Sequence, residues 1–224
     1  NNDFREDTMD QNQRKNIWLL GMTSGMILFL LMVYILVKQP ELLHKIDVSG
    51  QLLYQLVYSH DGLTSFFTYI TTLGNRHAFI LYCILLAGSI IFVQRKKLVW
   101  FILMAFVLSV LCNHFVKDIF ARTRPELEHL VYASGFSFPS GHAMNSMVFF
   151  GLLLYFFYGI AQKKWQKALI VIGFSIVILG IAMSRAAVGV HFVSDIVAGL
   201  SLGLCIVCVT LFVYESSEGL FQLK

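Results

Sequence analysis

The sequence predicts an all-α integral membrane protein, built as one bundle of six transmembrane helices with an amphipathic interfacial helix between spans one and two. Of its 224 residues, 57% are hydrophobic and 13% are charged, and the mean hydropathy is +0.71. Soluble domains contain roughly 45–50% apolar residues. Six stretches approach the length of about 20 apolar residues that a spanning helix needs. No polar region is long enough to form a second domain.

The expected spans run from Ile17 to Val37, from roughly His77 to Val93, and then over Leu98 to Val116, His142 to Ala161, Ala168 to Met183 and Phe192 to Tyr214. The first stretch is too long and too weakly basic at its front for a signal peptide, and it lacks a small-residue cleavage site, so we expect a retained helix. We expect a polar, disordered tail over residues 1–16, a membrane domain over 17–214 and a short cytoplasmic tail over 215–224.

An amphipathic segment separates the first two spans. Its apolar residues recur at intervals of three and four: Leu42, Leu43, Ile46, Leu52, Leu53, Leu56 and Val57. This spacing predicts a helix that lies along the membrane surface. The segment SHDG at 59–62 ends that helix, and the following TSFFTYITTLG leads into the second span.

The lysine and arginine bias of the short loops predicts the orientation, because cytoplasmic loops are enriched in these residues. With six spans both termini share a side, and that side carries Arg14, Lys15, the QRKK turn at 94–97 and QKKWQK at 162–167. We therefore predict a multi-pass protein of the cell membrane with cytoplasmic termini. The loops after spans one, three and five then face the extracytoplasmic side.

Charge and cysteine content argue against several other functions. The net charge is +4 and the basic residues form short interhelical clusters, so we expect no nucleic-acid partner. All four cysteines lie in apolar stretches, where a thiol packs as a small hydrophobic group. Cys205 and Cys208 form C-x-x-C, but on an apolar helix without polar neighbours this motif gives little support for a redox or metal function. No obligate protein partner is evident.

Ionisable residues gather at the outward ends of spans three to six: Lys117, Arg124, His142, Arg185, His191 and Asp195. Each such residue costs about 2.5–3.5 kcal/mol at membrane depth, so these positions usually mark function. We expect the helix ends to bring them into one cavity.

The first group is KDIFARTRP at 117–125. A separation of seven residues is two helical turns, so we expect Lys117 and Arg124 to point from one helix face, with Pro125 discouraging further helix. Two cations without an acidic partner indicate an anion site. The alternative is a basic cluster that reaches to lipid headgroups.

The second group is PSGH at 139–142. A proline turn, the Ser140 hydroxyl and the Gly141 N–H at the mouth of an apolar helix offer a phosphate cradle at the positive end of the helix dipole. His142 follows in the first helical turn, within reach of a bound anion. The alternative is a histidine that is merely exposed at the interface beside the helix cap.

The third group is SRAAVGVHFVSD at 184–195. Arg185 ends span five, and His191 and Asp195 lie four residues apart, so on one helix they share a face. The Asp195 carboxylate can then accept a hydrogen bond from His191 Nδ1–H and leave Nε2 with its lone pair outward, as in a nucleophile or base. The alternative is an Asp–His pair that only satisfies two buried polar groups.

Taken together, K-x6-R-P, P-S-G-H and S-R-x5-H-x3-D resemble the three-part signature of the type 2 phosphatidic acid phosphatase superfamily, which also includes glucose-6-phosphatases and vanadium haloperoxidases. Every motif position is matched. The six spans and the ITTLGN segment at 70–75 are similar to the bacterial membrane branch, so the resemblance covers nearly the whole chain from Ile17. The spans exclude a soluble haloperoxidase.

The resemblance implies a metal-independent phosphatase without a cofactor. Lys117, Arg124 and Arg185 would bind the phosphate with Ser140 and Gly141. His191 would attack phosphorus to give a phosphohistidine, and Asp195 would stabilise the charge that forms. His142 would act as general acid and then as general base. No carboxylate-rich or H-x-H cluster that would bind a metal is found.

Several neighbouring residues have less certain roles. We expect Arg122 to be structural or to contact a second phosphate, and Asn113 and His114 to satisfy each other or the backbone. The aromatic residues Tyr132, Phe136 and Phe138 would form either a partial lid or an interfacial anchor.

A site at the outward membrane surface suits an amphiphile whose phosphate lies at headgroup level. The expected partners are therefore the lipid bilayer and a lipid phosphate. Relatives that act on phosphatidylglycerophosphate and on undecaprenyl pyrophosphate have indistinguishable motifs, so these lipids and phosphatidate all remain candidates. The second hypothesis is a membrane binding or transport protein that retains the anion site without turnover; binding alone would not need both histidines.

Overall fold

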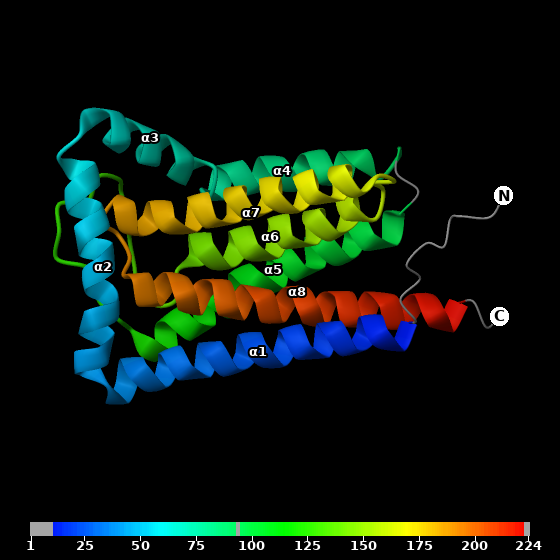
Figure 1. Ribbon diagram of the computed structural model, residues 1–224, viewed down its shortest axis with the longest axis horizontal. Coiled ribbons are helices and arrows are strands. Elements are labelled where there is room, and N and C mark those ends of the chain that lie inside the picture. Colours follow the sequence, from blue (N-terminus) through cyan, green and yellow to red (C-terminus); the bar gives the residue numbers. More distant parts are fainter. Residues whose placement is uncertain (1–10, 93–94, 222–224) are drawn as a thin grey trace.

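The computed structural model describes residues 11–92 and 95–221, and the regular secondary structure in this part of the chain is helical, without a strand. Its eight helices are α1 (Gln11–Lys38), α2 (Pro40–Tyr58), α3 (Asp61–Thr72), α4 (Arg76–Ser89), α5 (Lys96–Phe120), α6 (Gly141–Tyr158), α7 (Lys164–Ala187) and α8 (Val193–Phe221). Figure 1 shows the axes of α1 and α4 to α8 lying roughly parallel or antiparallel to one another, while α2 crosses one end of the bundle.

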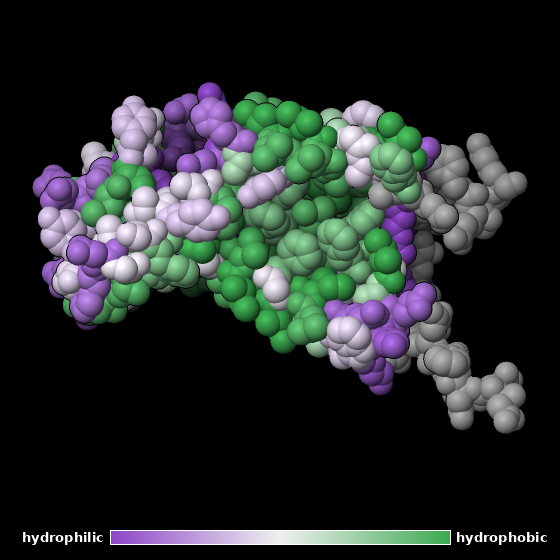
Figure 2. Space-filling model, turned by 90° about the horizontal axis from the view of Figure 1, so that it is seen from above, coloured by the Kyte–Doolittle hydropathy of each residue, from purple (hydrophilic) through white to green (hydrophobic). Residues whose placement is uncertain are grey.

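Helix α8 lies in the middle of the bundle, where it contacts α1, α5, α6 and α7. The core beside it is mainly apolar, with Leu98, Ile102 and Leu152 completely buried. Many large apolar side chains on the outside remain exposed, and Figure 2 shows them as a green belt between two more hydrophilic ends. An apolar exterior of this extent identifies a surface that meets lipid rather than water.

The apolar helices confirm a multi-pass membrane protein, but they do not confirm six spans. Four described helices are long and apolar enough to cross a membrane: Asn12–Lys38, Lys96–Phe120, Lys164–Ala187 and Val193–Ser217. A fifth span results if α3 and α4, which meet at an angle of 46°, count as one. Helix α6 is 18 residues long and begins at Gly141, so it includes only the last two residues of the PSGH segment.

The helices extend beyond several expected span limits. Helix α1 begins at Gln11, so part of the expected N-terminal tail is helical, and α8 continues to Phe221, well into the expected C-terminal tail. The other residues of these tails, 1–10 and 222–224, lie outside the described residues. Likewise α5 and α7 reach far enough to include Lys117 and Arg185.

The helix expected between the first two spans is α2. It begins with Pro40 in the first turn, where a missing N–H costs nothing. Its buried residues, Asp47, Gly50, Tyr54 and Val57, follow a helical spacing and face the bundle. On its outer side several of the leucines that define the amphipathic pattern remain exposed, among them Leu42, Leu52 and Leu56. Helix α2 therefore packs one face against the bundle and exposes an apolar face on the opposite side.

The two ends of the bundle differ. The first residue of α1, the last residue of α8 and the α6–α7 connection lie at one end, and α2 with the 121–140 segment lies at the other (Figure 1). The motif residues predicted from the sequence all belong to this second end.

Candidate active site

The segment 121–140 links α5 to α6 and forms one wall of the site. Ala121, at φ 43°, caps α5 in the left-handed conformation and turns the chain away from the helix axis. The Ser137 N–H then donates to the Arg122 carbonyl oxygen at 2.8 Å, and the Leu130 N–H donates to the Val188 carbonyl oxygen at 3.1 Å. One hydrogen bond thus links the two ends of the segment, and the other links its middle to the connection between α7 and α8.

The expectation that Lys117 and Arg124 share a helix face is wrong. Lys117 lies in the last turn of α5, but the helix ends at Phe120, and Arg124 lies in the following loop. The left-handed Ala121 stops the helix, and Pro125 disfavours helical geometry for the residue before it.

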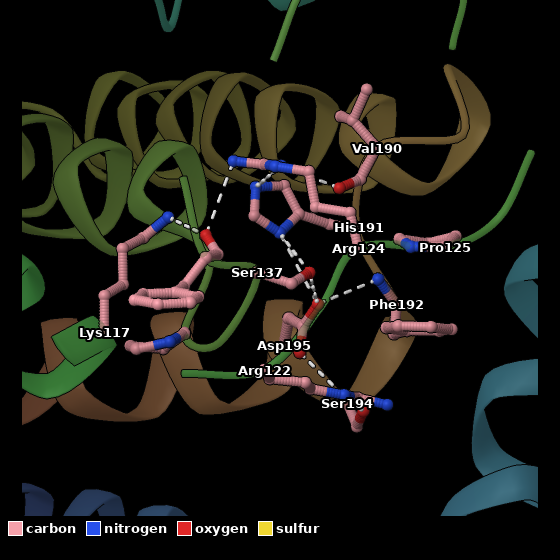
Figure 3. A network of polar contacts seen from close by, with 12 residues as sticks. Lys117, Arg122, Arg124, Pro125, Ser137, Val190, His191, Phe192, Ser194 and Asp195 are labelled. Carbon is pink, nitrogen blue, oxygen red and sulfur yellow. Dashed lines mark hydrogen bonds and ion pairs between the residues drawn. The ribbon is translucent and has the colours of Figure 1, made fainter. Parts of the chain in front are cut away.

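The two cations nevertheless meet. Lys117 Nζ donates to the Phe136 carbonyl oxygen at 2.6 Å, and Arg124 Nη2 lies 3.4 Å from the same oxygen. Arg124 also donates to the carbonyl oxygens of Ser134 at 2.8 Å and Gly135 at 3.0 Å. Figure 3 shows both side chains directed at this short stretch of backbone. The carbonyl oxygens of this stretch accept hydrogen bonds from the N–H groups of Lys117 and Arg124 that would otherwise bind a phosphate.

Arg124 determines which nitrogen of His191 carries the proton. Arg124 Nη1 lies 3.2 Å from His191 Nε2 and 2.8 Å from the Val190 carbonyl oxygen. A guanidinium can only donate, so Nε2 must be the accepting, unprotonated nitrogen. The proton of neutral His191 therefore resides on Nδ1, and the Nε2 lone pair faces the cations.

Ser137 lies between His191 and Asp195. Its hydroxyl donates to Asp195 Oδ2 and lies 3.2 Å from His191 Nδ1, whereas Nδ1 and Oδ2 are 3.5 Å apart (Figure 3). His191 precedes α8, which begins at Val193, so the two residues do not share a helix as expected. The pair still meets at a spacing of four residues, and Ser137 is a contact that the motifs did not reveal.

Burial keeps His191 neutral. The residue is only 4% exposed, and burial lowers its pKa from 6.5 to about 3, with the charges of Arg185 and Arg124 acting in the same direction. Asp195 opposes this shift through its hydrogen bond and its charge. The imidazole therefore keeps its lone pair at neutral pH.

The PSGH segment starts α6 as expected, with Ser140 as the N-cap and Gly141 as the first helical residue. The Ser140 N–H donates to the Asp195 backbone carbonyl at 3.0 Å. A Cβ on Gly199 would lie 2.5 Å from the Ser140 carbonyl oxygen, and one on Gly141 would lie 2.9 Å from Asn113 Oδ1. Glycine at these two positions lets α8 and α5 approach the start of α6 closely.

The bend between α3 and α4 contacts two of the predicted site residues. Asn75 Oδ1 lies 3.0 Å from His142 Nε2, and Thr71 Oγ1 accepts a hydrogen bond from Arg185 Nη1. Neither Thr71 nor Asn75 belongs to the three motifs. Within the described part of the chain, Arg185 Nε and the Ser140 hydroxyl are buried without a hydrogen-bond partner. Buried donors of this kind are rare unless a ligand or water completes them.

The residues predicted from the sequence therefore come together at one end of the bundle. Lys117 and His142 lie within electrostatic reach of Arg124 and Arg185. No three His, Cys, Asp or Glu side chains among residues 11–92 and 95–221 are grouped as metal ligands. The assembled site is rich in cations and contains two histidines.

The family model of the PAP2 superfamily matches residues 98–217, which is more than half of the chain. The chain belongs to the PAP2 superfamily. Phosphatidylglycerophosphatase B of Bacillus subtilis (strain 168) is 37% identical over 148 residues, covering 63% of this chain and 70% of that protein. These matches confirm the predicted phosphatase class.

Two solved structures have a fold similar to that of this chain. One is the crystal structure of a transmembrane PAP2 type phosphatidylglycerolphosphate phosphatase from Bacillus subtilis, with a TM-score of 0.80 and 24% identity over 88% of this chain and 96% of that chain. The other is Aquifex aeolicus LpxE, with a TM-score of 0.56 and 24% identity over 72% of this chain and 93% of that chain.

The predictions for the residues next to the PAP2 motifs are partly confirmed and partly wrong. Asn113 Nδ2 donates to the Pro139 carbonyl oxygen at 3.3 Å and His114 Nδ1 contacts the Val110 carbonyl oxygen at 2.8 Å, so both bond to the backbone, one of the two expectations. The role of Phe138 as a lid or interfacial anchor is wrong, because this ring is completely buried.

Phe138 packs instead between Phe29 of α1 and Phe120 of α5. Of the other two aromatic residues, Tyr132 is 92% exposed and Phe136 is 39% exposed. The exposure of these two side chains leaves both the lid and the anchor interpretation open.

Proposed function

We propose that this PAP2 protein hydrolyses lipid phosphates or pyrophosphates at the extracytoplasmic membrane surface, through a phosphohistidine and without a metal ion. The candidate substrates are phosphatidylglycerophosphate, phosphatidate and undecaprenyl pyrophosphate. The similarity to phosphatidylglycerophosphatase B favours the first of these. A site at the end of an apolar bundle suits a lipid, because the tails remain in the bilayer while the phosphate reaches the cations.

The observation that carries this proposal is the arrangement around His191. Its Nε2 lone pair faces Arg124, while Arg185 Nε and the Ser140 hydroxyl supply buried donors that have no partner in the described residues. A phosphate dianion would complete these donors, and Lys117 would add a further charge. Substrate binding would also draw Arg124 from Nε2 and expose the nucleophile.

The first half of the reaction transfers the phosphoryl group. His191 Nε2 attacks phosphorus in line, an N–P bond forms, and the P–O bond to the leaving group breaks. His142, in its imidazolium form, gives its Nε2 proton to the leaving oxygen and becomes a neutral imidazole. The contact between His142 Nε2 and Asn75 Oδ1 is consistent with a proton on that nitrogen, since an amide oxygen only accepts.

The second half releases inorganic phosphate. A water molecule attacks phosphorus, His142 takes a proton from it, and the N–P bond breaks to restore His191. Through both halves Asp195 and Ser137 hold Nδ1–H and stabilise the charge on the imidazole. Three cations, Lys117, Arg124 and Arg185, offset the charge that collects on the phosphoryl oxygens.

The proposed topology has six spans, formed by α1, by α4 with its bent partner α3, and by α5 to α8. Helix α2 would lie along the extracytoplasmic surface, with its exposed leucines toward lipid. The termini would be cytoplasmic, together with the basic α6–α7 connection at the same end of the bundle (Figure 1).

Phosphate release from short-chain forms of the candidate lipids, measured on the purified protein in detergent with EDTA present, tests this function. Activity should persist in EDTA and should fall by about a thousandfold or more in His191→Ala, because the nucleophile is lost. His114→Ala is the matched control, since this exposed histidine bonds only to its own helix in the described residues, and it should retain activity.

Failure to release phosphate from any substrate, or activity that survives His191→Ala, would favour the non-catalytic binding or transport protein. Loss of activity in EDTA that returns with a divalent cation would refute the metal-free mechanism alone. Comparing the lipid monophosphates with the polyprenyl pyrophosphate in the same assay ranks the substrates.

A further inference from the structure

Behind the proposed nucleophile a chain of buried charges connects the site to α2. Arg122 Nη1 donates to Asp195 Oδ1 at 2.6 Å, and Arg122 Nη2 donates to Asp47 Oδ2 at 2.7 Å. The side-chain exposures are 5% for Asp47, 12% for Arg122 and 0% for Asp195. Figure 3 shows Arg122 on the side of Asp195 that faces away from His191.

The position of Arg122 does not favour the second-phosphate interpretation. Its Nη1 also donates to Ser194 Oγ at 2.7 Å, and its guanidinium lies 4.0 Å above the centre of the Phe192 ring. The group is therefore engaged with two carboxylates, a hydroxyl and an aromatic face. This packing matches the structural role that the sequence left open for it.

Asp47 is held as firmly as Arg122. Its Oδ1 accepts the Ser194 backbone N–H at 3.0 Å while its Oδ2 accepts from Arg122. Both oxygens of Asp47 thus bond to groups that surround Asp195 in the first turn of α8. The carboxylate of Asp47, which is remote in sequence, is therefore fixed against the start of α8, the helix that carries Asp195.

The charges of Asp47 and Arg122 determine how strongly the negative charge of Asp195 acts on His191. With Arg122 alone, a buried guanidinium would largely neutralise Asp195 at low effective dielectric. With Asp47 on its other side, Arg122 is shared between two carboxylates, and the three groups keep one net negative charge. That charge lies where the imidazole becomes positive during phosphoryl transfer.

We propose that Asp47 is a positioning residue for the His191–Asp195 pair and acts through Arg122. Arg122 fixes Oδ1 of Asp195 so that Oδ2 points to Ser137 and His191, and Asp47 preserves the negative charge of the assembly. Helix α2 is therefore a component of the catalytic machinery as well as a surface element. This inference rests on the proposed function, because it requires His191 to gain charge during the reaction.

The test is steady-state phosphate release by Asp47→Asn, which removes the charge but keeps one oxygen to accept the Ser194 N–H. The amide nitrogen that replaces Oδ2 cannot accept from Arg122. The kcat should fall about tenfold, the loss expected when a charge-assisted contact weakens. KM should change less than about twofold, since Asp47 does not touch the phosphate. Glu41→Gln, an exposed acid in the first turn of the same helix, is the matched control and should leave kcat unchanged.

A second pair of variants separates positioning from simple destabilisation. Arg122→Gln should lower kcat by more than Asp47→Asn. The double variant should lose no more than Arg122→Gln alone, because the charge of Asp47 acts through Arg122 and the asparagine oxygen can still accept the Ser194 N–H. Independent losses that multiply in the double variant would overturn the proposal. So would an Asp47→Asn protein whose kcat stays within twofold of the original.

Thermal unfolding of each variant in detergent provides the check on folding. If Asp47→Asn unfolds at the same temperature as Glu41→Gln, its loss of kcat cannot be a loss of folded protein. The original protein and His191→Ala are assayed in parallel. Phosphate release by the former and not by the latter keeps the proposed function intact whatever Asp47→Asn does.

Discussion

At the scale of single residues, the site holds its proposed nucleophile in a reactive form before any substrate arrives. Ser137 and Asp195 lie on the Nδ1 side of His191 and Arg124 lies on the Nε2 side, so one tautomer is selected. Burial keeps the ring neutral. The tautomer and the neutral state together keep a lone pair on Nε2, which would be free to attack phosphorus once Arg124 turns to the substrate.

The lowered pKa of His191 predicts the pH dependence of activity. A pKa of about 3 means that the attacking nitrogen stays unprotonated as the pH falls from 8 to about 5. Any acid limb of kcat/KM in that range must come from another group, such as the second ionisation of the phosphate near pH 6. Two substrates whose phosphates differ in second pKa should therefore show acid limbs that move with the substrate. A limb fixed near pH 6.5 for both would indicate an ordinary His191.

Asn75 offers a second prediction at this scale. It is the N-cap residue of α4, yet its side chain makes no capping hydrogen bond within the described helices and contacts His142 instead. Asn75→Ala should lower kcat about tenfold, the equivalent of one lost hydrogen bond, because His142 is no longer oriented. KM and the unfolding temperature should change little. Loss of stability with unchanged kcat per folded molecule would contradict a role in orienting His142.

The motif residues could be predicted from the sequence because charged groups at the ends of apolar helices stand out. The residues that support them could not. Ser137, Thr71 and Asn75 are ordinary polar residues whose importance depends on contacts with distant segments. Asp47 was hidden within an amphipathic pattern that explained its helix without it. No periodicity or spacing reveals which remote side chain completes a buried charge.

At the scale of helices, α1 and α8 share the most extensive contact of any pair of described helices. A Cβ on Gly25 would lie 2.9 Å from the Ser201 carbonyl oxygen, and one on Gly21 would lie 2.6 Å from Cys208 Sγ. Small residues at a helix interface permit this approach in membranes, where packing rather than the hydrophobic effect drives association. The glycines of α1 thus serve contact with α8.

This interface predicts the effect of an added methyl group. Gly25→Ala should lower the unfolding temperature, because forcing a side chain into a packed interface costs about 1–3 kcal/mol. Gly173→Ala in α7 is the matched control, since no described atom lies within 4 Å of its added Cβ, and it should be neutral or stabilising. Thermal unfolding in one detergent compares them. Equal shifts in both variants would contradict a tight α1–α8 contact.

Sequence pattern predicted the existence of the helices better than their ends and bends. The helix α2 and its break near residue 59 were expected, and the structure has them. The stop of α5 at the left-handed Ala121 was not, because alanine gives no local signal for that conformation. The bend of 46° between α3 and α4 also escaped, since the tertiary contacts of Thr71 and Asn75 accompany it rather than any proline.

At the scale of the whole molecule, the site and the basic α6–α7 connection lie at opposite ends of an apolar bundle (Figure 1). This separation predicts the labelling of single cysteines in a variant without the four native ones. Tyr132→Cys, at an exposed position near the site, should react with an impermeant thiol reagent in intact cells. Gln162→Cys, in the α6–α7 connection, should react only after lysis. The reverse pattern would invert the predicted orientation.

The pairing of α1 with α8 has a consequence for biosynthesis. Helix α1 precedes the other described helices and packs along α8, which follows them, so during translation α1 lacks this partner until α2 to α7 have been made. Until α8 has been inserted, the glycine-lined face of α1 therefore contacts lipid or makes transient contacts with other protein segments. The α1–α8 interface forms only after α8 has been inserted, so a protein truncated before α8 would leave the glycine-lined face of α1 without its partner.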